Sequence, residues 1–266
     1  MFLGEPPQTA YDLRFNLAGF QVRIHPFFWI MALIFGGGNY PDATQLLVGI
    51  PVILVSILVH ELGHTFAMRY YGQHSRIVLY AFGGLAIPDG GVFDFVSQRS
   101  RKPYQQIVIS AAGPLAGLGL AALTAAFVVA AGGRIETQVV GIMPYVLADT
   151  TATIFENDAA SRLISTLLFI NVWWSLLNLM PVYPLDGGQI ARELFIMQDP
   201  WKGLRNSVIL SLVVAGAIAV WGLTSSQIFL GIMFASLAFS NWQVLQQIDG
   251  RGGFGGGGGF GGGRPW

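Results

Sequence analysis

The sequence predicts an all-α polytopic membrane protein with about six transmembrane helices and one small β-hairpin. Of the 266 residues, 53% are hydrophobic. Only 11% are charged, against about 25% in an average soluble domain. Apolar runs of roughly 20 residues recur along the chain, and a helix of that length crosses a hydrocarbon core. We therefore expect one domain that is solvated by lipid.

Five apolar runs are long enough to span a membrane, and a sixth run is short. The short run, residues 24–36, could cross the membrane or could be re-entrant. The long runs are residues 46–68, 104–131, 163–182, 207–223 and 227–245.

These runs divide the chain into three parts. We expect an N-terminal cytoplasmic segment (1–23), a membrane domain (24–247) and a glycine-rich tail (248–266). The composition of the tail cannot bury a core, so we expect it to be disordered.

Lys and Arg residues set the expected orientation, because cytoplasmic loops carry an excess of both. With six spans and both termini inside, all but two of the 14 basic residues fall on the cytoplasmic side. The two outside are Arg134 and Arg162. We therefore expect a multi-pass protein of the cell membrane with cytoplasmic termini.

A short β-prone segment follows the first long span. Ile77-Val78-Leu79-Tyr80 is interrupted by Phe82-Gly83-Gly84 and resumes as Leu85-Ala86-Ile87 before Pro88. We expect residues 77–87 to form a hairpin at the cytoplasmic membrane surface.

Charge and cysteine content exclude several kinds of function. The net charge is zero, so no overall basic field attracts nucleic acid. The chain has no cysteine, which excludes thiolate metal ligands, a cysteine nucleophile and disulfides.

Two histidines are spaced to share a metal ion. In His60-Glu61-Leu62-Gly63-His64 the histidines are four residues apart, so on a helix they lie on one face and reach one zinc. Glu61 lies beside that face and is placed to take a proton from a water that zinc activates. The alternative is that these are polar residues satisfied within a helix bundle. That alternative is costly, because two His and a Glu would be buried in an apolar span.

A catalytic zinc usually takes three protein ligands. Asp186 is the strongest acidic candidate for the third, because it follows an apolar span after Pro181 and Pro184 and precedes Gly187-Gly188. The spacing alone is equally consistent with a turn aspartate at the membrane surface. The other histidines, His25 and His74, are expected to be interfacial rather than ligands.

Several further motifs accompany these residues. Leu185-Asp186-Gly187 follows Asn178, and Ala112-Gly113-Pro114-Leu115-Ala116-Gly117 lies on an intervening span. Together with the His60–His64 motif and Phe82-Gly83-Gly84, they resemble the site-2 protease family, the intramembrane zinc metalloproteases of peptidase family M50. The resemblance covers residues 20–190.

The resemblance implies that Asp186 completes a site for one zinc ion per chain. It implies a metalloendopeptidase that cleaves peptide bonds in or near transmembrane or signal-peptide-like segments of membrane-protein substrates, in regulated intramembrane proteolysis. The loop 132–160 has no room for the PDZ domain of many bacterial members, and no CBS domain is seen, so we expect a minimal form.

We expect Asn178, Gly83 and Gly84 to bind substrate. The substrate helix must unwind, and the 77–87 segment could then pair with it by strand addition. The expected partners are that substrate and the lipid bilayer, without nucleic acid; no feature predicts the oligomeric state.

Two other functions are compatible with buried polar residues in a membrane. A metal transporter also uses intramembrane His and Asp, but it would repeat such ligands on several helices or show inverted repeats, and we find neither. A catalytically silent scaffold would have lost one of the motif residues, and all four are present.

Overall fold

We analysed a computed structural model, which describes residues 5–36, 43–81, 83–88, 102–140, 143–149 and 158–252. Within these residues, five helices are long and apolar enough to cross a membrane, and they coincide with the five long runs predicted from the sequence. The shortest, with 21 residues, extends about 31 Å. The five are α2 (Ala43–Tyr70), α4 (Pro103–Ala130), α5 (Asp158–Asn178), α7 (Gly203–Thr224) and α8 (Ile228–Gly252).

The short run forms the helix α1 (Pro26–Gly36). Its 11 residues extend about 16 Å, roughly half of a hydrocarbon core. The span count of six therefore stays a prediction, while the five long spans agree with it.

A four-stranded sheet lies beside the helices, in the order β1-β2-β3-β4. The predicted hairpin is confirmed as β3 (Ser75–Tyr80) paired antiparallel with β4 (Gly83–Pro88). A second hairpin, β1 (Leu13–Leu17) with β2 (Phe20–Ile24), was not expected. The second half of the predicted N-terminal segment 1–23 thus belongs to this sheet.

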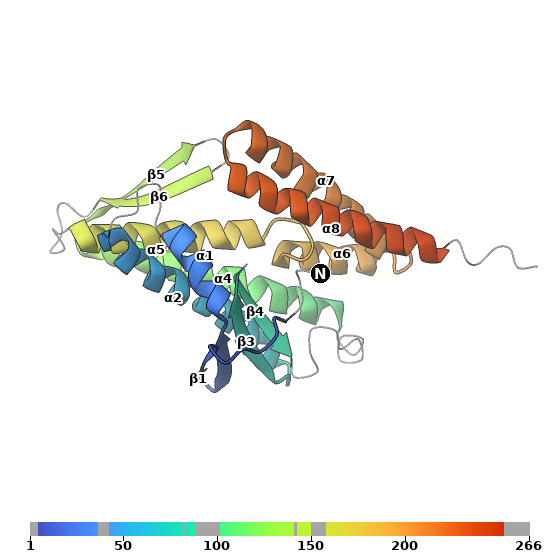
Figure 1. Cartoon of the computed structure of the whole chain (residues 1–266), viewed down its shortest axis with the longest axis horizontal. Helices are drawn as coiled ribbons and strands as arrows, with labels where there is room; N and C mark the ends of the chain where they lie inside the picture. Colours follow the sequence, from blue (N-terminus) through green and yellow to red (C-terminus); the bar gives the residue numbers. More distant parts are fainter. Residues whose placement is uncertain are drawn as a thin grey trace, which may run out of the picture.

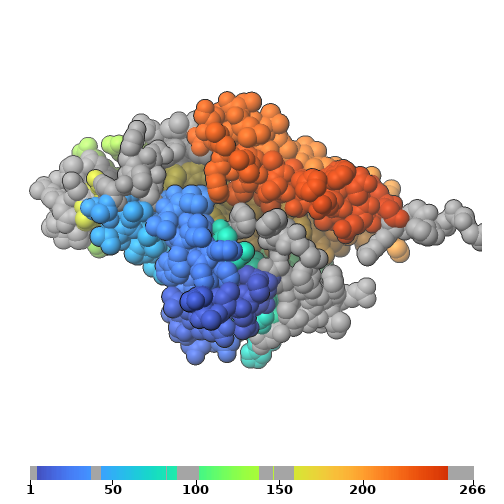
Figure 2. Space-filling model, in the orientation of Figure 1, coloured from blue at the N-terminus to red at the C-terminus, as the bar shows by residue number. Residues whose placement is uncertain are grey.

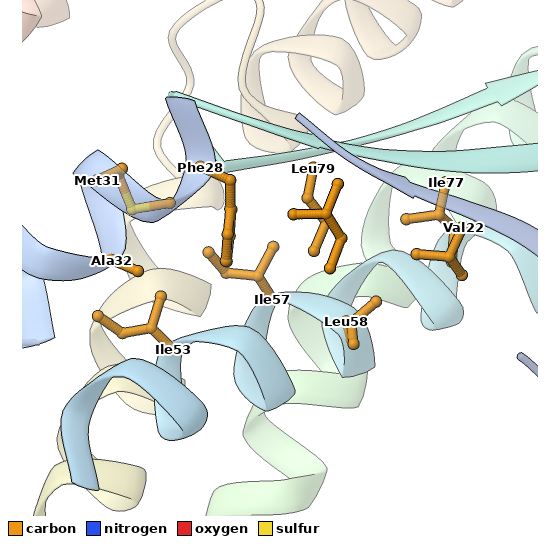
Figure 3. Close-up of a cluster of buried hydrophobic side chains, with 10 residues drawn as sticks. Val22, Phe28, Met31, Ala32, Ile53, Ile57, Leu58, Ile77 and Leu79 are labelled. Atoms are coloured by element: carbon orange, nitrogen blue, oxygen red, sulfur yellow. The ribbon is translucent and has the colours of Figure 1, made fainter. Parts of the chain in front are cut away.

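The parallel pairing of β2 with β3 brings α1 and α2 against the sheet. Parallel strands need a crossover connection, and here α1 and α2 supply it. Figure 3 shows how apolar side chains from the strands meet those from both helices. The fully buried members of this cluster include Val22, Ile77 and Leu79 from the sheet, Phe28 from α1 and Ile57 from α2. This core fixes the position of α2 relative to β3 and β4.

Two other regions differ from the sequence prediction. The loop 132–160 contains an antiparallel pair, β5 (Arg134–Val140) and β6 (Met143–Asp149). Helix α8 continues to Gly252, so the first residues of the predicted disordered tail are helical. Residues 253–266 lie outside the described part of the chain.

The C-terminal half contains a helix that the sequence did not predict. The helix α6 (Asp186–Gln198) follows the loop 179–185 and packs on α4 and α7. Figure 1 shows α7 and α8 side by side next to α6. In Figure 2 this pair (orange to red) lies above the N-terminal strands and α1 (blue), and the ring centroids of Phe35 on α1 and Phe229 on α8 are 5.0 Å apart.

Candidate metal centre

Two elements bring three buried side chains to one point. His60 and His64 lie one turn apart on α2, and Asp186 is the first residue of α6. His60 Nε2 is 3.2 Å from His64 Nε2 and 3.2 Å from Asp186 Oδ2, and His64 Nε2 is 3.3 Å from the same oxygen. These three atoms form a nearly equilateral triangle that could hold one metal ion.

The hydrogen bond of the second histidine shows which of its nitrogens carries a proton. His64 Nδ1 is 2.7 Å from the carbonyl oxygen of Ile109, and a carbonyl only accepts, so Nδ1 is the donor. The Nε2 of neutral His64 therefore presents a lone pair to the triangle. Such an outer hydrogen bond is the usual way to orient a metal-bound imidazole.

The geometry of the triangle fits zinc. A proton on His60 Nε2 could satisfy one of the three close contacts only, whereas a cation among the three atoms satisfies all of them. Tetrahedral zinc with ligand bonds of about 2.0–2.1 Å separates its ligand atoms by about 3.3 Å. The observed separations of 3.2–3.3 Å match this value.

Glycine and proline explain how α4 reaches the second histidine. A Cβ atom at Gly113 would overlap the His64 imidazole, and one at Gly63 would overlap the carbonyl of Ala112. Glycine at both positions lets α2 and α4 approach closely, as small residues do in membrane bundles. Pro114 cannot donate the helical hydrogen bond to the carbonyl of Ser110, the residue that follows Ile109.

The carboxylate of Glu61 is buried against strand β4. Glu61 is 4% exposed, and its side chain occupies the space that a Cβ at Gly84 would fill. The backbone N–H of Ala86 donates to this carboxylate. That N–H therefore points away from β3, so the unpaired edge of β4 faces Glu61.

Asp186 does not lie in a surface turn. It is 8% exposed, and the chain after it is helical. Gly187 and Gly188 belong to the first turn of this helix. A Cβ at Gly187 would overlap the Leu179 carbonyl, so the glycines permit α6 to start tightly against the preceding loop.

The other predicted residues lie in different surroundings. His25 is 5% exposed, and its Nδ1 accepts from the Phe27 N–H at the start of α1; its interfacial position stays a prediction. His74 is exposed between α2 and β3. Asn178 ends α5 and donates to the Trp174 carbonyl of its own helix. Gly83, with φ of +117°, lies against the Trp174 ring, and Phe82 lies outside the described residues.

Comparison with known proteins agrees with this site. Residues 48–220 match peptidase family M50. The Mycobacterium tuberculosis protein named Rip3 is 27% identical over 191 residues, which cover 66% of this chain and 42% of Rip3. Zinc metalloprotease MJ0392 of Methanocaldococcus jannaschii is 25% identical over 228 residues, covering 83% of this chain and 56% of that protein. The chain thus spans between two fifths and three fifths of the length of these relatives.

A solved structure has the same fold. The site-2 protease from Methanocaldococcus jannaschii superimposes with a TM-score of 0.55 at 21% identity, covering 88% of this chain and 95% of that one. Together with the five apolar helices, these matches identify an integral membrane protein. Since the family match covers well over half of the chain, the protein belongs to peptidase family M50, the site-2 protease family of zinc metalloproteases.

Proposed function

We propose that the protein is an intramembrane zinc endopeptidase that hydrolyses peptide bonds in or near transmembrane segments of membrane-protein substrates. One observation carries the proposal: three buried side-chain atoms that can bind a metal ion converge within 3.3 Å beside a buried Glu. Buried acceptors that face one another are costly unless a cation joins them. Family membership supports the same chemistry.

Each residue of the site has a separate role in this proposal. His60, His64 and Asp186 would hold the zinc, which as a Lewis acid would activate water and polarise the carbonyl of the scissile peptide bond. Glu61 takes a proton from the attacking water and returns it to the leaving amine. The Ala86 N–H orients the Glu61 carboxylate, and the Ile109 carbonyl orients His64.

The edge of β4 provides a place for the substrate backbone. The Ala86 N–H already donates to Glu61. In an antiparallel strand, every second residue points its N–H and C=O away from the paired strand, so Gly84 also presents both groups at the free edge. An unwound substrate segment can add to this edge as a further strand, next to Glu61. Asn178 donates to its own helix, so we assign its side-chain oxygen, as an acceptor, to the substrate backbone.

The proposed setting is the cell membrane, with both termini and the β3–β4 hairpin on the cytoplasmic side. The distribution of Lys and Arg supports this orientation. Reporter fusions at residue 101 and within 150–157 are expected to report opposite sides of the membrane; the same side for both would contradict it.

The transporter alternative gains no support from the structure. Among the described residues, one group of ligand-type side chains could hold a metal, and its three members are buried at one point. A transport path would need ligands at successive depths.

The test uses the purified protein in detergent with a transmembrane substrate. The wild type is expected to contain about one zinc per chain and to cleave the substrate. Glu61→Gln keeps the size of the side chain but removes the base, so zinc should stay while turnover falls roughly 10²–10⁴-fold. Full turnover by Glu61→Gln, or absence of cleavage by zinc-loaded wild type on transmembrane substrates, would refute the proposal.

A further inference from the structure

The loop that leads to Asp186 interrupts the helical backbone hydrogen bonds inside the helix bundle. Between α5 and α6 the chain passes Tyr183 and Pro184, where neither helix supplies hydrogen bonds to the Tyr183 peptide groups. In a lipid environment such groups must find partners within the protein. Those of Tyr183 are found on the two C-terminal helices.

Two buried side chains hold the two polar groups of Tyr183. The Tyr183 N–H donates to Ser211 Oγ on α7 at 3.0 Å. Asn241 Nδ2 on α8 donates to the Tyr183 carbonyl at 2.6 Å. Ser211 and Asn241 are each 1% exposed, so neither bond is exchanged readily for a bond to water.

The orientation of the Asn241 amide follows from its neighbours. Nδ2 lies near two carbonyl oxygens, of Tyr183 and of Leu237 at 2.9 Å, and both can only accept. The amide nitrogen must therefore face them. The buried Oδ1 has no hydrogen-bond partner among the described residues, so Asn241 acts here as a donor.

The backbone of Tyr183 is connected to Asp186 through close contacts. The Leu185 N–H donates to the Val182 carbonyl at 2.8 Å, and Val182 is fully buried between the helices of the α7–α8 pair. A Cβ at Gly188 would overlap the Val182–Tyr183 peptide, so the first turn of α6 rests directly on it. A shift of Tyr183 would consequently move Asp186.

We propose that Ser211 and Asn241 are positioning residues of the metal site. By binding the N–H and the carbonyl of Tyr183, they set the distance of Asp186 from His60 and His64. The inference rests on the proposed function, in which Asp186 binds the zinc. It assigns a role to α8, which lies outside the residues 48–220 that match the family.

Two substitutions test the inference. Asn241→Leu removes the donor at similar volume, and Ser211→Ala removes one acceptor and is the milder change. Zinc affinity should be measured by chelator competition, and the site geometry from the absorption spectrum of the cobalt(II)-substituted protein. Loss of a direct hydrogen-bond partner of a metal ligand lowers metal affinity roughly 10- to 100-fold. Ser211 and Asn241 act on Asp186 through Tyr183, so we expect a loss near the lower end, about 10-fold, with an altered cobalt spectrum.

Matched controls separate positioning from helix packing. Ser207→Ala removes a buried hydroxyl one turn away on α7 whose bond goes to Leu204 of the same helix, so metal affinity should stay at the wild-type value. Ser211→Thr keeps the hydroxyl and should restore affinity toward that of the wild type. Wild-type affinity and cobalt spectrum in both Asn241→Leu and Ser211→Ala would overturn the inference, even if their thermal stability falls.

The proposed function can fail independently. If the wild type binds zinc but cleaves no peptide, the endopeptidase proposal fails. The comparison of metal affinity among the variants then still tests the positioning role of Ser211 and Asn241.

Discussion

The Arg23 group and the metal group of this protein differ in how their donors and acceptors are balanced; in the Arg23 group, Arg23 and Asp12 are buried, while Glu5 and Arg76 are partly exposed. Around Arg23, two cations and two carboxylates pair: Arg23 contacts Asp12 and Glu5 at 3.0 Å each, and Glu5 contacts Arg76 at 2.7 Å. In the metal group of His60, His64 and Asp186, three atoms that can all bind a metal ion face one another. Paired opposite charges need no further partner, whereas converging acceptors require a cation. Burial alone therefore does not indicate a binding site; unbalanced donors and acceptors do.

The largest expected difference between the two groups follows removal of one carboxylate from each. Asp186→Ala should lower zinc content from about one per chain to near zero and reduce cleavage to background, because the metal loses a third of its protein ligands. Asp12→Ala should leave zinc and turnover unchanged in the folded protein. Metal analysis and cleavage assays on both variants check this. Normal zinc in Asp186→Ala would place the third ligand elsewhere.

The second prediction changes the Arg23 group and leaves the metal group intact. Arg23→Met leaves the stem but removes the guanidinium, so Asp12 stays buried without its cation. Leaving the Asp12 carboxylate without this partner costs about 1–3 kcal/mol of unfolding free energy. Unfolding in detergent should show this loss, with zinc per folded chain unchanged. A loss of zinc from folded Arg23→Met would show that the two groups are coupled.

The third prediction concerns the space around the metal group. In Gly113→Ala the new methyl group overlaps His64, which must move. A displacement of about 1 Å in a catalytic site can lower turnover roughly 10²-fold. Gly119→Ala on the same helix is the matched control, because a Cβ there meets no atom within 4 Å. Equal activity of the two variants would mean that the contact at Gly113 does not matter.

The spans and the metal motif were predictable from the sequence for direct physical reasons. Apolar runs of about 20 residues mostly form transmembrane helices, and two histidines four residues apart share a helix face in any fold. Asp186 was different. Its spacing was equally consistent with a surface turn, and the resemblance to a family, not the residues, favoured the ligand.

Other elements were missed although a signal was present. Polar and apolar residues alternate on both sides of Ala18-Gly19, where φ is +51° and +84°. A two-residue turn between alternating strands is typical of a hairpin, so β1 and β2 were predictable. The edge position of β4 was not, because strand order depends on the distant β2 pairing with β3.

The positioning residues had no detectable signal. Ser211 and Asn241 are isolated polar residues in apolar helices, without a spacing that relates them to Asp186. Their relation to Tyr183 exists only once α7 and α8 pack on the loop. Contacts of this kind require the tertiary structure.

The smallest expected effect is the pH dependence of the Arg23 group. Burial alone would raise the pKa of Asp12, but hydrogen bonds from Thr9 and Arg23 and the Arg23 charge outweigh it and lower that pKa from 3.8 to about 2. Because the pKa is lower in the folded state, Asp12 stabilises the fold fully above about pH 5. This stabilisation is lost as the pH falls toward 2.

Asp12→Asn tests this without changing the size of the side chain. The difference in stability between the wild type and this variant should be constant from pH 7 to about pH 5 and should shrink as the pH approaches 2. Both proteins are measured with chelator, so that loss of zinc in acid does not enter, and titration of the metal group cancels in the difference. A difference that stays constant down to pH 2 would show that the Asp12 carboxylate does not stabilise the fold through its charge.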